Sequence, residues 1–82
     1  MALTVYSTTW CGPCRRLKTQ LAREGIAFED IDIERDPAAA EFVMSVNNGN
    51  QTVPTVVIET PNGRVVRTNP SALEVKTLLG AA

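Results

Sequence analysis

Four short stretches of the chain have the arrangements of apolar and polar residues expected of β-strands. These stretches are residues 2–7, 26–33, 55–58 and 65–66. In the second stretch, Ile31 and Ile33 fall on one face. Asp30 and Asp32 fall on the opposite face, which we expect to be solvated. The last two stretches flank a Pro-Asn-Gly sequence at residues 61–63, which predicts a hairpin.

The stretch that follows the first strand has the period of a helix. Pro13 suits the first turn, and Cys14, Leu17 and Leu21 recur on one face. Gly25 is expected to end this helix in a left-handed conformation.

Two further helices are predicted later in the chain. The second begins with Asp36 as its N-cap and Pro37 in its first turn. Its apolar stripe, expected to be core, consists of Ala39, Phe42, Val43 and Val46. The third begins with Ser71 and Glu74 in a capping-box pattern. Its apolar residues are Leu73, Leu78 and Leu79.

The predicted order of elements is β-α-β-α-β-β-α within a single domain covering residues 1–82. The first two strands are joined through a helix, so we expect them to be parallel. The last two form an antiparallel hairpin. This predicts an α/β fold with a four-stranded mixed sheet and helices on both faces, a thioredoxin-like arrangement.

The composition is that of an ordinary globular domain, with 44% hydrophobic and 21% charged residues among 82. A net charge of −1 argues against nucleic acid or an acidic membrane surface as partner. No apolar run has the length of a membrane span, and the first residues lack the pattern of a secretory signal. We therefore expect a cytoplasmic monomer.

The only cysteines are Cys11 and Cys14, in the sequence Trp-Cys-Gly-Pro-Cys at residues 10–14. A structural zinc site needs four ligands, and the chain contains no histidine, so a site within one chain is disfavoured, although a dimer could supply four sulfurs. A purely structural disulfide would close a very small loop and stabilise the fold little.

A redox role fits this spacing better. Cys11 lies between a strand and a helix, where the helix N-terminus favours a nucleophilic thiolate. Cys14 follows one turn later and is expected to be partly buried, in position to resolve a mixed disulfide at Cys11. Gly12 adds little bulk beside an incoming substrate, and Trp10 and Pro13 complete the active-site loop.

Thr52, Val53 and Pro54 precede the third strand. If the Val53–Pro54 bond were cis and packed against the cysteine turn, the Val53 backbone would be free to hold an extended substrate. Otherwise the proline merely starts a strand.

With this proline and the Cys-Gly-Pro-Cys sequence, the chain resembles the glutaredoxin and thioredoxin superfamily. The resemblance implies that Cys11 is the nucleophile, Cys14 resolves, and Pro54 is cis. Thioredoxins carry a buried aspartate six residues before the nucleophile, where this chain has Val5.

The stretches AAAEFVMSVNNGNQTVPTV and TNPSALEV resemble the mycoredoxins, glutaredoxin relatives that use mycothiol. The resemblance implies that residues 47–51, together with Asn69 and Ser71, border a low-molecular-weight thiol, with Thr52, Val53 and Pro54 contributing. Mycothiol, or glutathione, would then be a co-substrate, with no bound cofactor and no metal.

We interpret the chain as a thiol-disulfide oxidoreductase that releases small thiols from thiolated proteins. An NADPH-dependent flavoprotein disulfide reductase would supply electrons, directly or through the small thiol. One alternative is a small thioredoxin or ribonucleotide-reductase redoxin, reduced by thioredoxin reductase. An alternative of another class is an iron-sulfur carrier, in which Cys11 of two chains and free thiols hold a cluster.

Overall fold

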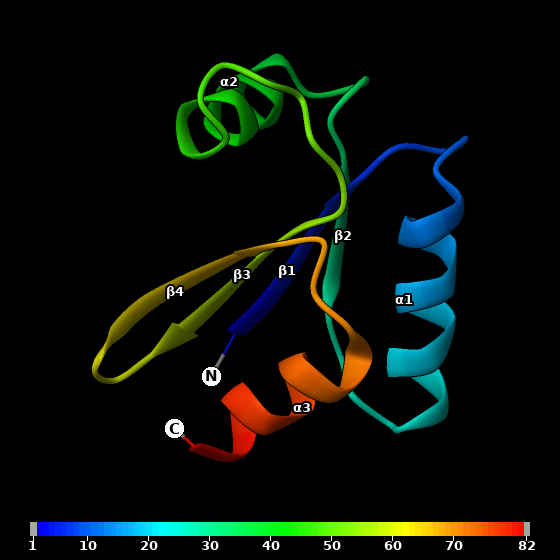
Figure 1. Ribbon diagram of the computed structural model, residues 1–82, viewed down its shortest axis with the longest axis vertical. Coiled ribbons are helices and arrows are strands. Elements are labelled where there is room, and N and C mark those ends of the chain that lie inside the picture. Colours follow the sequence, from blue (N-terminus) through cyan, green and yellow to red (C-terminus); the bar gives the residue numbers. More distant parts are fainter. Residues whose placement is uncertain (1, 82) are drawn as a thin grey trace.

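The seven elements occur in the predicted order in the computed structural model, which describes residues 2–81 (Figure 1). The strands are β1 (Ala2–Ser7), β2 (Glu29–Asp32), β3 (Thr55–Thr60) and β4 (Gly63–Thr68). The helices are α1 (Gly12–Arg23), α2 (Pro37–Val46) and α3 (Ala72–Ala81).

The four strands form one mixed sheet in the order β2-β1-β3-β4. β1 is parallel to β2 and antiparallel to β3, and β3 and β4 form the predicted hairpin. α1 and α3 lie on one side of the sheet and α2 lies on the other (Figure 1), so the prediction of helices on both faces is confirmed.

The end of α1 shows why β2 is shorter than predicted. Gly25 has a φ of 71°. Its N–H bonds to the Ala22 carbonyl at 3.1 Å, and the Ile26 N–H bonds to the Leu21 carbonyl at 3.0 Å. This double closure is a Schellman motif, in which the residue after the glycine still belongs to the helix end. Ile26 is therefore held by the end of α1, residues 27 and 28 lie in a loop, and β2 begins only at Glu29.

Two hydrophobic clusters hold the layers together. The larger lies between the sheet and α1 and α3, and its buried members are Leu3, Val5, Leu17, Leu21, Val56, Ile58 and Val75. The smaller lies beneath α2 and contains Ile33, Ala39 and Val43, with Tyr6 and Phe42 packed against it.

Two positions differ from the expected apolar stripes. Val46 is 38% exposed, because it lies in the last turn of α2, outside the smaller cluster. Leu73 is 73% exposed, and Val75 is the residue of α3 that is fully buried. Residues two apart on a helix face different directions, so Val75 and Leu73 cannot both face the sheet.

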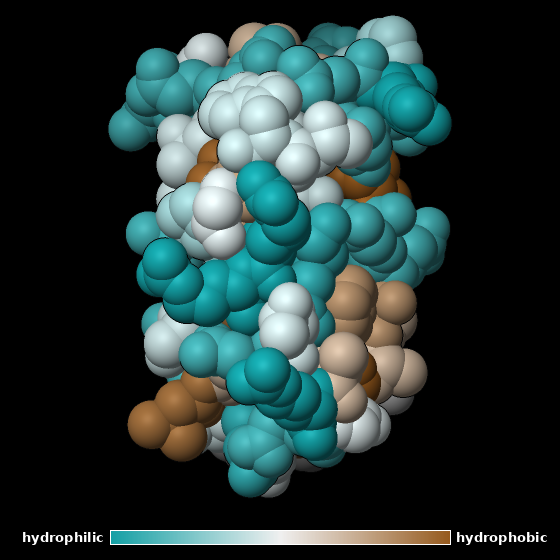
Figure 2. Space-filling model, turned by 90° about the vertical axis from the view of Figure 1, so that its right-hand side faces the viewer, coloured by the Kyte–Doolittle hydropathy of each residue, from teal (hydrophilic) through white to brown (hydrophobic). Residues whose placement is uncertain are grey.

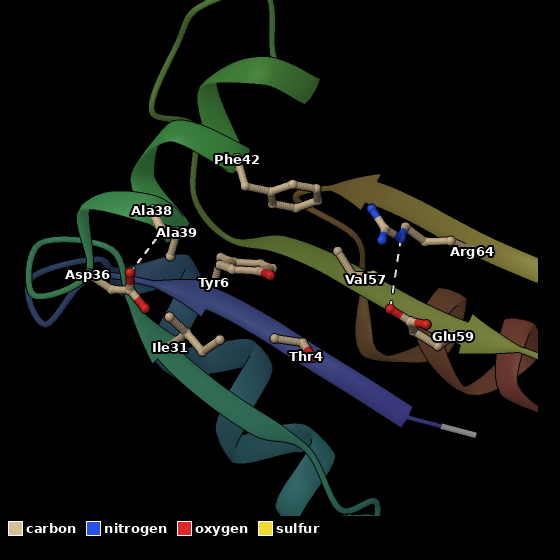
Figure 3. Close-up of a pocket in the computed structure, with 10 residues that line it drawn as sticks. All are labelled: Thr4, Tyr6, Ile31, Asp36, Ala38, Ala39, Phe42, Val57, Glu59 and Arg64. Atoms are coloured by element: carbon tan, nitrogen blue, oxygen red, sulfur yellow. Dashed lines mark hydrogen bonds and ion pairs between the residues drawn. The ribbon is translucent and has the colours of Figure 1, made fainter.

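The sheet is only partly covered on the α2 side, where a shallow cavity of about 300 Å³ remains (Figure 3). Phe42 of α2 and Arg64 of β4 lie above a floor that includes Tyr6 and Val57. The Arg64 guanidinium carbon is 5.7 Å from the centre of the Phe42 ring, and its Nε is 3.8 Å from Glu59 Oε1. This cavity contains neither cysteine.

Candidate active site

The two cysteines lie where the chain passes from β1 into α1. Cys11 is the N-cap of α1, Pro13 is in the first turn, and the two cysteines form a disulfide with their Cα atoms 5.2 Å apart. The Cys14 backbone N–H donates to Cys11 Sγ at 3.2 Å. In the reduced protein, this N–H and the positive end of the helix would stabilise a thiolate at Cys11.

The two sulfur-bearing residues differ in their surroundings. Cys14 is fully buried, more than predicted, and Cys11 retains 5% exposure. Gly12 and Pro13 between them are exposed. Trp10 is 68% exposed beside the disulfide, and its indole N–H donates to Glu34 Oε1 at 3.1 Å. A partner can therefore approach Cys11 over Trp10 and the first helical turn, whereas Cys14 lies behind Cys11, inside the protein.

The Thr52-Val53-Pro54 segment lies next to the cysteine turn, although Val53 and Cys11 are 42 residues apart in the sequence. The Val53–Pro54 bond is cis, as the resemblance implies, and the Val53 carbonyl oxygen lies 3.8 Å from Cys11 Sγ. Behind them, the Thr55 hydroxyl donates to the Thr52 carbonyl at 2.8 Å. This bond links the segment to the first residue of β3 and so orients the Val53 backbone toward the sulfur.

Asn69 and Ser71 are brought to the same end of the molecule. The Asn69 N–H donates to the Pro54 carbonyl at 2.7 Å, and the Asn69 φ of 51° turns the chain from β4 toward α3. The Ser71 hydroxyl accepts the Glu74 N–H at 3.0 Å, so it acts as the predicted helix cap. The Glu74 carboxylate pairs with Arg67 at 3.3 Å instead of completing the capping box.

The predicted thiol-bordering role of residues 47–51 does not suit Asn47. Its amide nitrogen donates to the Val43 carbonyl at 2.8 Å and to the Thr55 hydroxyl at 3.1 Å. Its amide oxygen accepts the Thr68 hydroxyl at 2.6 Å. All the polar atoms of this side chain are engaged within the protein, where they connect α2, β3 and β4. Residues 48–51 are exposed.

A polar cluster next to α1 was not predicted from the sequence. The Ser7 hydroxyl donates to Asp30 Oδ1 at 2.7 Å. The Lys18 ammonium lies 2.9 Å from Asp30 Oδ2 and 3.4 Å from the Ser7 hydroxyl. Partial burial alone would raise the pKa of Asp30, but the hydrogen bonds from Ser7 and Lys18 and the charge of Lys18 lower it.

The location of this cluster relates it to the cysteine turn. Lys18 lies one helical turn after Cys14, and Asp30 is the β2 partner of Val5 in the parallel pair. A carboxylate thus lies on the strand next to Val5, whereas thioredoxins carry theirs at the position of Val5 itself. One signal was present in the sequence: the alternation of residues 26–33 places Asp30 on the same side as Ile26 and Phe28, which pack on the larger core.

Metal-ligating and membrane-spanning features are absent from residues 2–81. In this part of the chain, no group of three or more His, Cys, Asp or Glu side chains could hold a metal ion. None of the described helices is long and apolar enough to cross a membrane.

Comparison with known proteins gives consistent results. The glutaredoxin family model matches residues 3–66. A Mycobacterium tuberculosis protein named as a glutaredoxin is 58% identical over 78 residues, which is 95% of this chain and 89% of that protein. Mycoredoxin 1 of Corynebacterium glutamicum is 42% identical over 73 residues, 89% of this chain and 86% of that protein.

Solved structures share the fold along nearly the whole chain. NrdH-redoxin from Escherichia coli superposes with a TM-score of 0.76 at 26% identity, covering 95% of each chain. A thioredoxin-like protein superposes with a TM-score of 0.74 at 28% identity, covering 93% of this chain and 97% of its own. The sheet order and helix placement are therefore those of a thioredoxin-like fold, as predicted.

Proposed function

We propose that this chain, which belongs to the glutaredoxin family and is a thiol-disulfide oxidoreductase, releases mycothiol from thiolated proteins through Cys11, with Cys14 as the resolving residue. The observation that carries the proposal is the N–H of Cys14 directed at Cys11 Sγ at 3.2 Å, at the start of α1. That contact favours a thiolate at Cys11, whereas the fully buried Cys14 is shielded from a large substrate.

The reaction proceeds by two thiol-disulfide exchanges. The Cys11 thiolate attacks the small-thiol sulfur of the mixed disulfide, the protein sulfur leaves as a thiolate, and it takes a proton from solvent. Cys11 then holds the small thiol as a new disulfide. A second small-thiol thiolate attacks that thiol's sulfur and releases a small-thiol disulfide, which restores the Cys11 thiolate. The NADPH-dependent flavoprotein then reduces the small-thiol disulfide.

Cys14 provides a second route from the same intermediate. Its thiolate attacks Cys11 Sγ, releases the small thiol and forms the Cys11–Cys14 disulfide found in the structure. Two small thiols or a flavoprotein reductase must then return two electrons to that disulfide. This route is also the one by which a disulfide within a substrate protein would be reduced.

Mycothiol is supported as the small thiol by the relationship to Mycoredoxin 1 and by the polar surroundings of the site. Mycothiol presents sugar and inositol hydroxyls, for which the exposed amides of residues 48–51 and the Asn69 side chain are suitable hydrogen-bonding partners. The Ser71 hydroxyl already accepts the Glu74 N–H, so it would contribute to thiol binding mainly as a donor.

A second candidate function is direct reduction by thioredoxin reductase. It is favoured by the similarity to NrdH-redoxin, whose structural description attributes a thioredoxin-like activity profile to that protein. The Gly-Pro pair between the cysteines is also that of thioredoxins. In this case the Cys11–Cys14 disulfide would be the form that the reductase accepts.

The two functions are separated by a reductase assay with Cys14→Ser. The wild-type protein is supplied in parallel with mycothiol and its reductase, glutathione and its reductase, or thioredoxin reductase, and NADPH oxidation is followed. Under the proposed function, mycothiol gives the fastest turnover, and Cys14→Ser keeps much of it on small-thiol mixed disulfides while losing protein-disulfide reduction. Cys11→Ser is the inactive control. Loss of mycothiol-dependent turnover in Cys14→Ser would favour the thioredoxin-reductase route.

A further inference from the structure

A groove runs along α1 from the cysteine turn to the start of α3. Its first part, of about 330 Å³, adjoins the site and is lined by Pro13, Arg16, Leu17, Gln20, Asn69, Pro70 and Ser71. Its second part, of about 550 Å³, is lined by Gln20, Arg23, Glu24, Ser71, Ala72 and Leu73. The two parts share Gln20 and Ser71, so they form one continuous surface, called here the α1/α3 groove.

The charge of this groove is one-sided. α1 contains four of the eight cationic residues of the chain and no acidic residue. Arg16 and Arg23, which line the groove, are exposed and form no ion pair within residues 2–81. Glu24 at the far end is paired with Lys76 at 3.4 Å. The groove therefore offers two unneutralised guanidinium groups, although the whole chain has a net charge of −1.

The far end of the groove also contains an exposed apolar side chain. Leu73 is the most exposed large hydrophobic side chain among those described, at 73%. Figure 2 views the side of the molecule formed by α1, where hydrophilic side chains cover most of the surface and hydrophobic surface is limited to small separate areas. An isolated exposed leucine at the end of a basic groove suits a ligand that is acidic along its length and ends in an apolar residue.

We propose that the α1/α3 groove binds an extended acidic segment of the protein substrate, next in sequence to the thiolated cysteine whose mixed disulfide Cys11 attacks. This inference rests on the proposed oxidoreductase function and adds the chemistry of its protein partner. The groove begins at Pro13, between the two cysteines, so a segment bound there lies next to the mixed disulfide that Cys11 attacks.

The length of the groove sets the size of the segment. From Pro13 to Arg23 the helix rises about 15 Å, which four or five residues of extended chain would span. Arg16 and Arg23 are separated by a rise of about 10 Å, which corresponds to three extended residues. The expected segment thus carries two carboxylates about three positions apart and an apolar side chain at the end near Leu73.

The test uses peptides with one cysteine joined to 2-mercaptoethanol as a mixed disulfide. Five residues containing two glutamates three positions apart and a terminal leucine are placed before the cysteine in one peptide and after it in another. Matched peptides carry glutamines instead. The reduced protein transfers two electrons to each peptide, forming its own Cys11–Cys14 disulfide and releasing both thiols. The rate is followed by the fluorescence of Trp10, the only tryptophan.

The acidic segment should act from one side of the cysteine only, either before it or after it. For the wild-type protein at low salt, that acidic peptide should react about two- to thirtyfold faster than the matching glutamine peptide, as two exposed ion pairs permit. Arg16→Gln/Arg23→Gln should bring this ratio close to one. Arg35→Gln/Arg64→Gln, with the same change in net charge outside the groove, should keep it. A further pair of peptides has serine in place of the terminal leucine. Leu73→Ser should slow the reaction of the peptides that end in leucine and leave the rate with the peptides that end in serine unchanged.

Two results would overturn the inference. One is equal rates on acidic and glutamine peptides in both orders. The other is an equal loss of the ratio in both double variants, which would indicate a general effect of net charge. Hydroxyethyl disulfide, which has no charge and no peptide, is the reference substrate. If the wild-type protein fails to reduce hydroxyethyl disulfide, the proposed function is wrong. If it reduces hydroxyethyl disulfide but reacts equally fast with the acidic and glutamine peptides, only the groove inference is wrong.

Discussion

The side chain of Asn47 provides a quantitative test of how the site is supported. It donates to the Val43 carbonyl at 2.8 Å and to the Thr55 hydroxyl at 3.1 Å, and it accepts the Thr68 hydroxyl at 2.6 Å. Val43 lies in the last turn of α2, where carbonyl groups lack a partner from a following turn. Asn47→Ala should therefore leave this carbonyl without its side-chain donor and break two further bonds.

The magnitude follows from the burial of each partner. An unpaired buried carbonyl costs about 1–3 kcal/mol, and Val43 is fully buried. The bond to Thr55 adds about 1 kcal/mol, since that hydroxyl still donates to the Thr52 carbonyl and is not orphaned. The bond to Thr68 is exposed and adds little. The expected loss in the free energy of unfolding is about 2–4 kcal/mol.

The assay is urea unfolding of the oxidised protein, followed by far-ultraviolet circular dichroism at constant pH and salt. The slope of free energy against urea should be unchanged, and the midpoint should fall. Asn50→Ala is the matched control, because Asn50 is exposed in the same loop and should change stability by less than about 0.5 kcal/mol. A loss below about 0.5 kcal/mol for Asn47→Ala would refute the structural role assigned to this side chain.

Three further predictions concern the core, the ion pair and the thiols. Leu21 is fully buried in the larger cluster, so Leu21→Ala should lower the free energy of unfolding by about 2–5 kcal/mol in the same assay. The pKa of Asp30 is lowered by the hydrogen bond from Ser7 and by the pairing with Lys18, so these contacts stabilise the fold above the unfolded-state pKa, and this stabilisation is lost as the pH falls. Asp30→Asn should therefore cost about 0.2–1 kcal/mol at neutral pH and progressively less below about pH 4; a pH-independent cost would contradict this. In the reduced protein, iodoacetamide should modify Cys11 before Cys14 at neutral pH, as located by mass spectrometry, and the reverse order would contradict their assigned roles.

Local sequence signals predicted the elements well and their ends less well. Asp36 caps α2 through its contact with the Ala39 N–H at 3.1 Å, and Gly25 ends α1, because both effects depend on a few neighbouring residues. The predicted start of β2 was wrong by three residues, because alternation cannot distinguish a strand from a loop whose first residue, Ile26, is bonded to the end of the preceding helix. Val46 fits the helical period but lies beyond the surface that α2 covers.

The sequence by itself determined where the two reactive cysteines lie relative to the first helix. The spacing of Cys11 and Cys14 places both sulfurs at the N-terminal end of a helix, and that geometry is local. The order of strands and helices followed from periodicity, because each element must bury its own apolar face.

Only the tertiary structure decided which distant groups meet this turn. The approach of Val53 to Cys11 spans 42 residues, and the pairing of Asp30 with Ser7 spans 23. The α1/α3 groove likewise exists only because α3 packs next to α1. Such contacts depend on sheet register and on the packing of helices against the sheet, neither of which is encoded in the spacing of residues within one element.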